Sequence, residues 1–223
     1  MEHSINIFSF LPAEIVEKYM HVFMTFIVII ITFLIAFFSK KMTKEIPGRA
    51  QSFFEIIVES INNMVINVAG EEGGRFLPLI FGIAVYVFFS NIIGLIPGLA
   101  SPTANLNTTV APALVVFFTY NYIGIKKHGI NYIKQFMGPV LWLAPFMMVI
   151  EFIGHLARPL SLSVRLFGNI FGEDLVIAIL FMLVPYLIPL PMFFLGIFTC
   201  FLQTYIFMML TLIYISNALE ETH

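Results

Sequence analysis

The sequence predicts an all-α integral membrane protein with five transmembrane helices and one amphipathic interfacial helix, the last two spanning helices being long and tilted. Of its 223 residues, 60% are hydrophobic and only 11% are charged. A typical soluble domain carries about 25% charged residues. The apolar residues also form long runs separated by short polar segments, which is the pattern of a polytopic membrane protein. We therefore expect a single membrane domain over residues 1–223.

The N-terminal part of the chain is expected to begin outside the membrane. Residues 1–20 mix polar and apolar side chains and lack a basic flank before a short apolar core, so no cleaved signal peptide is predicted. Residues 21–39 are predicted to form the first spanning helix. A lysine-rich cluster starts directly after it, at Lys40. Because such clusters collect on the cytoplasmic side, the N-terminus is placed outside.

The next segment, residues 51–69, is predicted to be an amphipathic helix. Its apolar residues keep helical spacing on one face, while Glu55, Glu59 and Asn62 lie on the other. We interpret the two glutamates as a solvated face. A helix with this many polar groups does not face lipid on all sides, so we expect it to lie on the cytoplasmic surface.

Residues 76–125 are predicted to form a helical hairpin that crosses the membrane twice. Two apolar runs, residues 76–96 and 110–125, are joined by a polar turn over residues 97–109. The second run ends at Lys126 and Lys127, which marks the cytoplasmic side again. This return agrees with the first helix only if the amphipathic segment does not cross the membrane.

Residues 139–219 are predicted to form a pair of long, tilted helices. The apolar run over residues 141–184 has few polar breaks, and as one helix it would be about 66 Å long. A bilayer core is about 30 Å thick, so this helix must be tilted or broken, with Gly154 and Pro159 as the expected bend points. A second run, residues 192–216, returns and leaves the C-terminus in the cytoplasm.

The first of these two helices carries a polar stripe. At about 100° per residue, the polar residues on the same side as Arg165 are Glu151, His155, Arg158, Ser161, Asn169 and Glu173, whereas Asp174 falls on the opposite side. A charge near the bilayer centre costs at least about 2.5–3.5 kcal/mol, and a guanidinium does not lose its proton. Arg165 is therefore expected to face water, another helix or a partner protein.

Several of these polar residues also have a structural explanation. Arg158 lies near a membrane face and can extend its charge toward water, and His155 can bond a backbone carbonyl. A milder stripe on the second long helix includes Gly196, Gln203 and Tyr214. Asn169 and Gln203 can serve as hydrogen-bonding groups between the two helices. These alternatives stay open at the level of sequence.

Motifs for other chemistry are missing from the sequence. It contains no Gly-rich phosphate loop, no His-Glu-x-x-His zinc motif and no Gly-x-Ser-x-Gly elbow. Glu151 and His155 have the i, i+4 spacing of ligands on one helix face, but two ligands make a poor metal site. The single cysteine, Cys200, excludes an internal disulfide. No metal and no cofactor are expected.

Residues 158–169, which read Arg-Pro-Leu-Ser-Leu-Ser-Val-Arg-Leu-Phe-Gly-Asn, resemble the signature of subunit a of the F-type ATP synthase membrane sector. The resemblance covers nearly the whole chain. It includes the turn over residues 46–51, Asn91, the Asn105/Asn107/Thr108 turn, and residues 202–207, which read Leu-Gln-Thr-Tyr-Ile-Phe.

This resemblance implies the stator half of a rotary motor. A member of this family forms two aqueous half-channels and passes protons to and from the carboxyl groups of a ring of c subunits, so that proton flow drives rotation and ATP synthesis. It is not itself an enzyme. The implied partners are the c-ring, the peripheral stalk b subunits and membrane lipid, with no nucleic acid. The implied location is the bacterial plasma (inner) membrane.

The resemblance also assigns roles to residues. Arg165 matches the essential arginine, Asn169, Asp174 and Gln203 match the outer half-channel, and Glu151 and Arg158 match the cytoplasmic exit. We add His155 to the proton path because of its place on the stripe. Two positions depart from the family pattern: Glu173 stands where a small residue is usual, and Gly196 stands where many members carry His or Glu. We therefore predict that Glu173 supplies the titratable group missing at position 196.

Two alternatives from other functional classes have testable signatures. An intramembrane metal-dependent enzyme would use Glu151, His155 and Asp174 and would hold a stoichiometric metal. A stand-alone ion channel or transporter would conduct ions as the purified chain alone. The absence of an internal repeat weighs against the common transporter folds.

Overall fold

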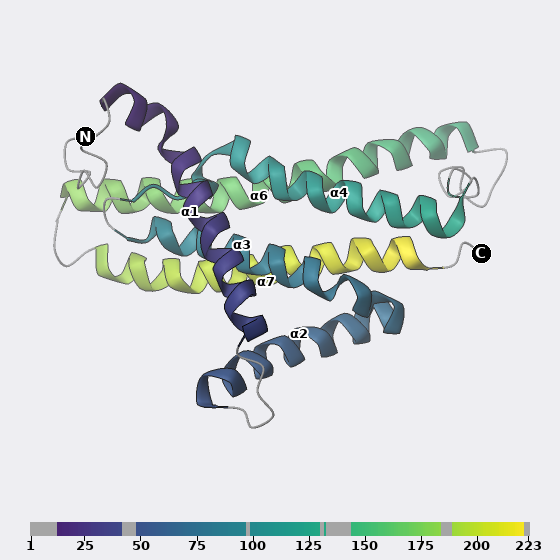
Figure 1. Cartoon of the computed structure of the whole chain (residues 1–223). Helices are drawn as coiled ribbons and strands as arrows, with labels where there is room; N and C mark the ends of the chain where they lie inside the picture. The colour runs from purple at the N-terminus through teal and green to yellow at the C-terminus, as the bar shows by residue number, and fades with distance from the viewer. Residues whose placement is uncertain are drawn as a thin grey trace.

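In the computed structural model, residues 13–41, 48–96, 99–129, 132, 144–183 and 189–220 are described, and every regular element within these ranges is helical (Figure 1). Five candidate membrane spans, each at least 18 residues long and strongly apolar, occur in these ranges. The all-α membrane fold expected from the sequence is thereby confirmed. Residues 1–12 of the predicted outer segment, part of the 46–51 turn, and residues 139–143 and 184–188 of the predicted long pair lie outside the described residues.

Helix α1 spans Ala13–Lys41 and so begins within the segment that we expected to precede the first spanning helix. Much of its surface is apolar and exposed, as at Phe33, which is 72% exposed. Such a surface suits contact with lipid. Met24 and Val28 are buried against Ile93 of the third helix. In Figure 1, α1 runs across the other helices, where α3, α4, α6 and α7 extend in a common direction.

Helix α2 spans Arg49–Gly73, a short 3₁₀ turn η1 spans Gly74–Phe76, and helix α3 spans Leu77–Gly94. The chain bends at Gly70, where φ is 68° and ψ is −174°. This conformation suits glycine because it lacks a Cβ. The bend lies one residue after the predicted end of the amphipathic helix at residue 69. Ser216 Oγ donates to the Val68 carbonyl at 2.8 Å and connects α2 to the last helix.

The polar turn between the hairpin helices contains a second 3₁₀ turn, η2, over Pro102–Ala104, and helix α4 spans Leu106–His128. We had expected the second hairpin helix to begin at residue 110. It begins earlier because Asn105 caps it, its side-chain oxygen accepting a hydrogen bond from the Asn107 N–H at 3.0 Å. At the other end of α4, Lys127 Nζ lies 2.6 Å from Glu72 Oε2, which ties α4 to the end of α2.

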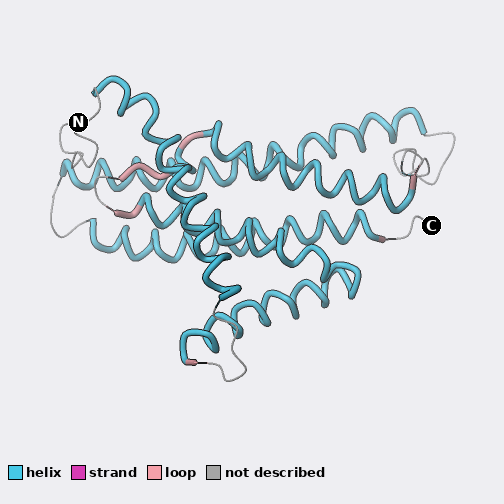
Figure 2. Tube along the Cα trace, in the orientation of Figure 1, coloured by secondary structure: helices cyan, strands magenta, loops and turns pink. Residues whose placement is uncertain are grey.

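Helices α6, spanning Ala144–Leu183, and α7, spanning Pro189–Leu219, form the long pair (Figure 2). Helix α6 continues without a break through Gly154 and Pro159, the two expected bend points, which leaves tilting as the way to fit the membrane. Its 40 residues make it about 60 Å long. A helix of this length fits a bilayer of about 30 Å only if it is strongly tilted.

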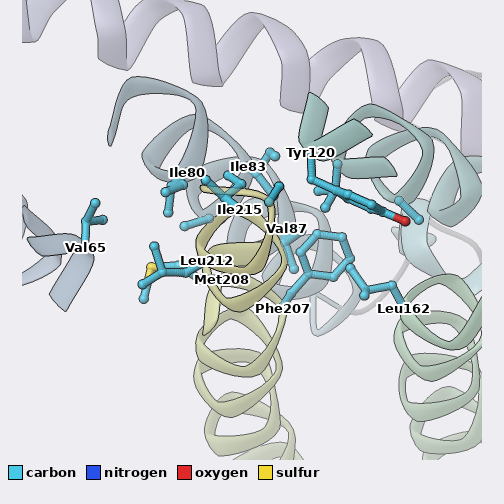
Figure 3. Packing of buried hydrophobic residues seen from close by; sticks show 14 of the residues in the cluster. Val65, Ile80, Ile83, Val87, Tyr120, Leu162, Phe207, Met208, Leu212 and Ile215 are labelled. Atoms are coloured by element: carbon cyan, nitrogen blue, oxygen red, sulfur yellow. The ribbon is translucent and has the colours of Figure 1, made fainter. Parts of the chain in front are cut away.

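The core lies where α3, α4, α6 and α7 meet, with α2 at its edge (Figure 3). Large buried side chains from all four of these helices fill it, including Ile80 of α3, Tyr120 of α4, Leu166 of α6 and Phe207 of α7, none of them more than 1% exposed. Because Tyr120 and Phe207 are packed this tightly, the polar residues near them on α6 and α7 are held in a defined register.

Candidate functional site

Arg165 lies on the exposed side of α6. Its neighbours Leu162 and Leu166 are buried in the core, at 2% and 0% exposure, while Leu160 and Val164 on the outer surface are 66% and 48% exposed. Arg165 makes no hydrogen bond or ion pair with any residue that the structure describes. The helix therefore presents one permanent positive charge on an outer face that is mainly apolar, with Ser161 and Asn169 as its exposed polar neighbours.

One turn further along α6, Asn169 connects the two long helices. Its Nδ2 donates to Oε1 of Gln203 on α7 at 2.8 Å. Gln203 is only 1% exposed, and its Nε2 has no hydrogen-bond partner among the described residues. The polar stripes of α6 and α7 thus meet at this point, through the two residues that the sequence suggested as hydrogen-bonding groups between the helices.

Glu173 points toward Gly196 of α7. A Cβ placed at position 196 would clash with Glu173 Oε1 and would lie 2.6 Å from Cδ2 of Leu95, the residue that directly follows α3. Both carboxyl oxygens of Glu173 are buried, with no hydrogen-bond partner in the described part of the chain. Glycine at position 196 leaves room for this carboxyl group, and a larger residue there would require the ends of the Glu173 and Leu95 side chains to shift.

Asp174 is half-buried in the same region. Glu173 and Asp174 act electrostatically on each other, and both act on the thiol of Cys200, which is fully buried. Sequence reasoning placed Asp174 on the opposite side from Arg165 and gave Cys200 no role beside this pair. The spacing in the sequence could have indicated that Cys200 lies near this pair, because it is four residues after Gly196 and three before Gln203 on one face of α7.

A second polar group lies nearer the start of α6. His155 Nε2 is 3.6 Å from Glu151 Oε1, and Arg158 Nη2 is 3.9 Å from the same oxygen. The Tyr120 hydroxyl of α4 is 3.3 Å from His155 Nδ1. The Arg158 guanidinium lies over the rings of Tyr120 and Tyr214, 5.7 Å and 5.4 Å from their centroids. Tyr120 had no sequence signal that marked it as part of this group.

The two polar groups lie on either side of Arg165 along α6. Glu151 precedes Arg165 by about 21 Å along the helix axis and Asp174 follows it by about 14 Å, at 1.5 Å per residue. Between them the described face of α6 toward α4 and α7 is mainly apolar, with Leu162, Leu166 and Ile170 buried. The arrangement is two separated polar clusters with a fixed cation between them.

No metal site appears in the described ranges, where no three His, Cys, Asp or Glu side chains gather. Asp174 is about 28 Å from His155 along the axis of α6. The three residues of the metal-enzyme alternative therefore do not share one site, although Glu151 and His155 do lie together.

The family model and the similar proteins found by comparison all point to the same family. A family model described as ATP synthase A chain matches residues 21–216. ATP synthase subunit a 3 of Pelobacter propionicus is 51% identical over 199 residues, which is 89% of this chain and 87% of the relative. ATP synthase subunit a of Geobacter sulfurreducens is 49% identical over the same shares of both chains. ATP synthase subunit a of Syntrophobacter fumaroxidans is 50% identical over 91% of this chain and 85% of its own length.

Proposed function

Because this chain belongs to the ATP synthase subunit a family, we propose that its two polar clusters line the two proton half-channels and that Arg165 separates them. As a family member, the chain is the non-catalytic, proton-translocating stator subunit of the membrane sector. It is a multi-pass protein of the bacterial inner membrane and assembles with the ATP synthase complex. The observation that carries the proposal is the position of Arg165 between two polar clusters on one helix.

The outer half-channel is formed by the cluster that follows Arg165 on α6. Asn169 and Gln203 supply hydrogen-bonding groups between α6 and α7, and Glu173 and Asp174 supply carboxyl groups. Glu173 lies about 12 Å from Arg165 along the axis. At that separation the carboxyl group lines the path without neutralising the arginine directly. Its burial against Gly196 supports a role as the titratable group of this path.

The cytoplasmic half-channel is formed by the cluster that precedes Arg165. Glu151 takes up or releases a proton at the cytoplasmic end, and His155 and Arg158 lie within 4 Å of its carboxyl group. The cytoplasmic cluster comes first along α6 and the outer cluster second, which agrees with a chain whose N-terminus is outside and whose C-terminus is cytoplasmic. In this orientation the lysines at the ends of α1 and α4 face the cytoplasm.

The partner that meets Arg165 is the c-ring, which docks on the exposed faces of α6 and α7. Each ring subunit brings a carboxyl group that is neutral in lipid, because burial in a low-dielectric medium disfavours the charged form. Beside the Arg165 guanidinium the carboxylate is favoured instead, so the proton leaves into one half-channel. The same fixed charge repels protons and blocks direct passage between the half-channels. The peripheral stalk b subunits hold this chain still against the ring.

The experiment that tests this proposal removes the charge at position 165. In inverted membrane vesicles, Arg165→Ala is expected to abolish ATP-driven proton pumping, measured by the quenching of a pH-sensitive dye. Arg165→Lys is expected to fail as well, because an ammonium group is more compact and more strongly hydrated than a guanidinium.

The same vesicles test the partners. Purification through a tag on this chain should recover a small carboxyl-bearing ring subunit and the stalk subunits in equal amounts from the parent and from Arg165→Ala. Near-normal pumping by either variant would overturn the assignment of Arg165. Recovery of the parent chain without a ring subunit would overturn the proposed partner.

A further inference from the structure

The guanidinium of Arg158 is held by two aromatic rings that come from different helices. Tyr120 of α4 and Tyr214 of α7 lie 5.9 Å apart between ring centroids, at an interplanar angle of 52°. Arg158 lies over both, within 6 Å of each centroid, which is the range of a cation–π contact. We refer to Tyr120 and Tyr214 as the tyrosine pair.

The tyrosine pair is itself fixed by the core. Tyr120 is 1% exposed and packs edge-on against Phe117. Its hydroxyl also lies 3.3 Å from His155 Nδ1. Tyr214 is half-buried and packs against the same core. A cation held by such rings has a set position, unlike one that extends freely toward water.

In that position Arg158 forms only a long ion pair with Glu151. The distance from Arg158 Nη2 to Glu151 Oε1 is 3.9 Å, whereas charge-assisted N–H···O bonds have lengths of about 2.7–2.9 Å. A close, bidentate arginine would hold the carboxyl group ionised. A carboxyl group that must gain and lose a proton in every cycle needs a weaker partner than that.

From this geometry we propose that Tyr120 and Tyr214 are positioning residues that hold Arg158 at a set distance from Glu151, so that Glu151 remains able to bind a proton from the cytoplasm. The proposal rests on the proposed role of Glu151 in the cytoplasmic half-channel. Neither tyrosine exchanges a proton in it; they act only through the position of Arg158.

The titratable and charged groups that face this site come from three helices and from Tyr132. Helix α6 supplies Glu151, His155 and Arg158, and Arg165 is close enough to act electrostatically on Tyr214. Helix α4 supplies Tyr120, and α7 supplies Tyr214. Tyr132, which follows α4, feels the charges of both Arg158 and Glu151 and bonds Asn121 at 3.2 Å. Among these groups Arg158 is the cation nearest to Glu151 that is charged at every working pH.

The test compares Tyr214→Leu with Tyr214→Phe in inverted vesicles, where the medium contacts the cytoplasmic face. Without the ring, Arg158 moves onto Glu151, and the closer ion pair competes with proton uptake from the medium. The alkaline limb of the profile of ATP-driven pumping against medium pH is expected to move down by about half a unit to one unit. Tyr214→Phe keeps the ring and should keep the parent profile.

Two further variants control this result. Tyr122→Leu removes an exposed tyrosine of α4 that lies near Lys126 and should leave the profile unchanged. Arg158→Gln removes the cation and should move the alkaline limb up, in the opposite direction. It also keeps the proposal testable where Tyr214→Leu does not assemble. An unshifted profile in Tyr214→Leu or in Arg158→Gln, or an equal shift in Tyr214→Phe, overturns the proposal.

Glu151→Gln separates this inference from the function on which it rests. If Glu151→Gln pumps with the parent's pH profile, the assignment of Glu151 to the cytoplasmic path is wrong. If Glu151→Gln stops pumping while Tyr214→Leu keeps the parent profile, the path stands and only the role of the tyrosine pair is wrong.

Discussion

At the scale of single residues, Glu173 stands out because its carboxyl group is buried without a hydrogen-bond partner among the described residues. Both its oxygens are buried without partners among the described residues, and they face Gly196 across the α6–α7 contact. No described residue occupies these oxygens, so they remain open to a proton donor or acceptor. The residue is therefore suited to relay protons rather than to carry a permanent charge.

We predict that Glu173→Gln strongly lowers ATP-driven proton pumping, because the amide keeps the shape of the side chain but cannot exchange a proton. Glu173→Gly should fail as well. Adding Gly196→Glu to Glu173→Gly should restore pumping, since removal of the Glu173 side chain leaves space for a carboxyl group from α7. Dye-quenching rates in vesicles with equal amounts of assembled complex measure all three variants.

The competing explanation is that Asp174 carries the protons and Glu173 only contacts water. In that case Glu173→Gln pumps like the parent, Asp174→Asn does not, and the relay hypothesis is wrong. The double variant gives a second criterion. If it pumps no better than Glu173→Gly, positions 173 and 196 do not share one channel.

At the scale of elements, the close approach of α3 to the η2 turn depends on Gly94. A Cβ at this position would lie 2.5 Å from the Ser101 Cβ and 3.2 Å from its Cα. Ser101 is in turn bonded to the Ser90 carbonyl at 2.9 Å and to Thr103 at 2.8 Å. Because the obstructing atoms include backbone, the turn cannot move aside without disturbing these buried hydrogen bonds.

Gly94→Ala is therefore expected to destabilise the protein by about 1–3 kcal/mol, the typical cost of overpacking. Gly82→Ala is the matched control on the same helix, because a Cβ there meets nothing within 4 Å, and alanine favours a helix over glycine by about 1 kcal/mol. The measurement is the fraction of complex that keeps this subunit as a detergent extract is warmed. Equal midpoints for the two variants would contradict the packing argument.

At the scale of the whole molecule, the predicted orientation places the η2 turn outside and the end of α4 in the cytoplasm. Asn107 and Lys126 are exposed and lie at opposite ends of α4. Cys200 is fully buried, so the natural chain should react little with a thiol reagent. Asn107→Cys is expected to react with a membrane-impermeant maleimide in spheroplasts, and Lys126→Cys only in inverted vesicles. The reverse pattern would overturn the orientation.

Much of the protein was predictable from its sequence because the deciding interactions are local. The lengths of the apolar runs indicated the spanning helices, and the helical period put Glu151, His155, Arg158 and Asn169 on the side of Arg165 before any coordinates were known. Both follow from backbone geometry, which repeats every 3.6 residues. Element ends were less accurate. Ala13, Gly73 and Leu106 lie several residues from the predicted bounds, since caps and short 3₁₀ turns decide where a helix ends.

Contacts between helices were decided only by the tertiary structure. The sequence could not show that Asn169 bonds Gln203, that Glu173 faces Gly196, or that two tyrosines from α4 and α7 hold Arg158. These pairs depend on the rotation and register of one helix against another. Register is set by the packing of the whole core, in which Tyr120, Leu166 and Phe207 interlock, and a shift of one residue turns a side chain by about 100°. The sequence alone determines which side chains share one face of a helix, because that depends only on the helical repeat. Which side chains meet across two helices is determined by how the helices pack in the core.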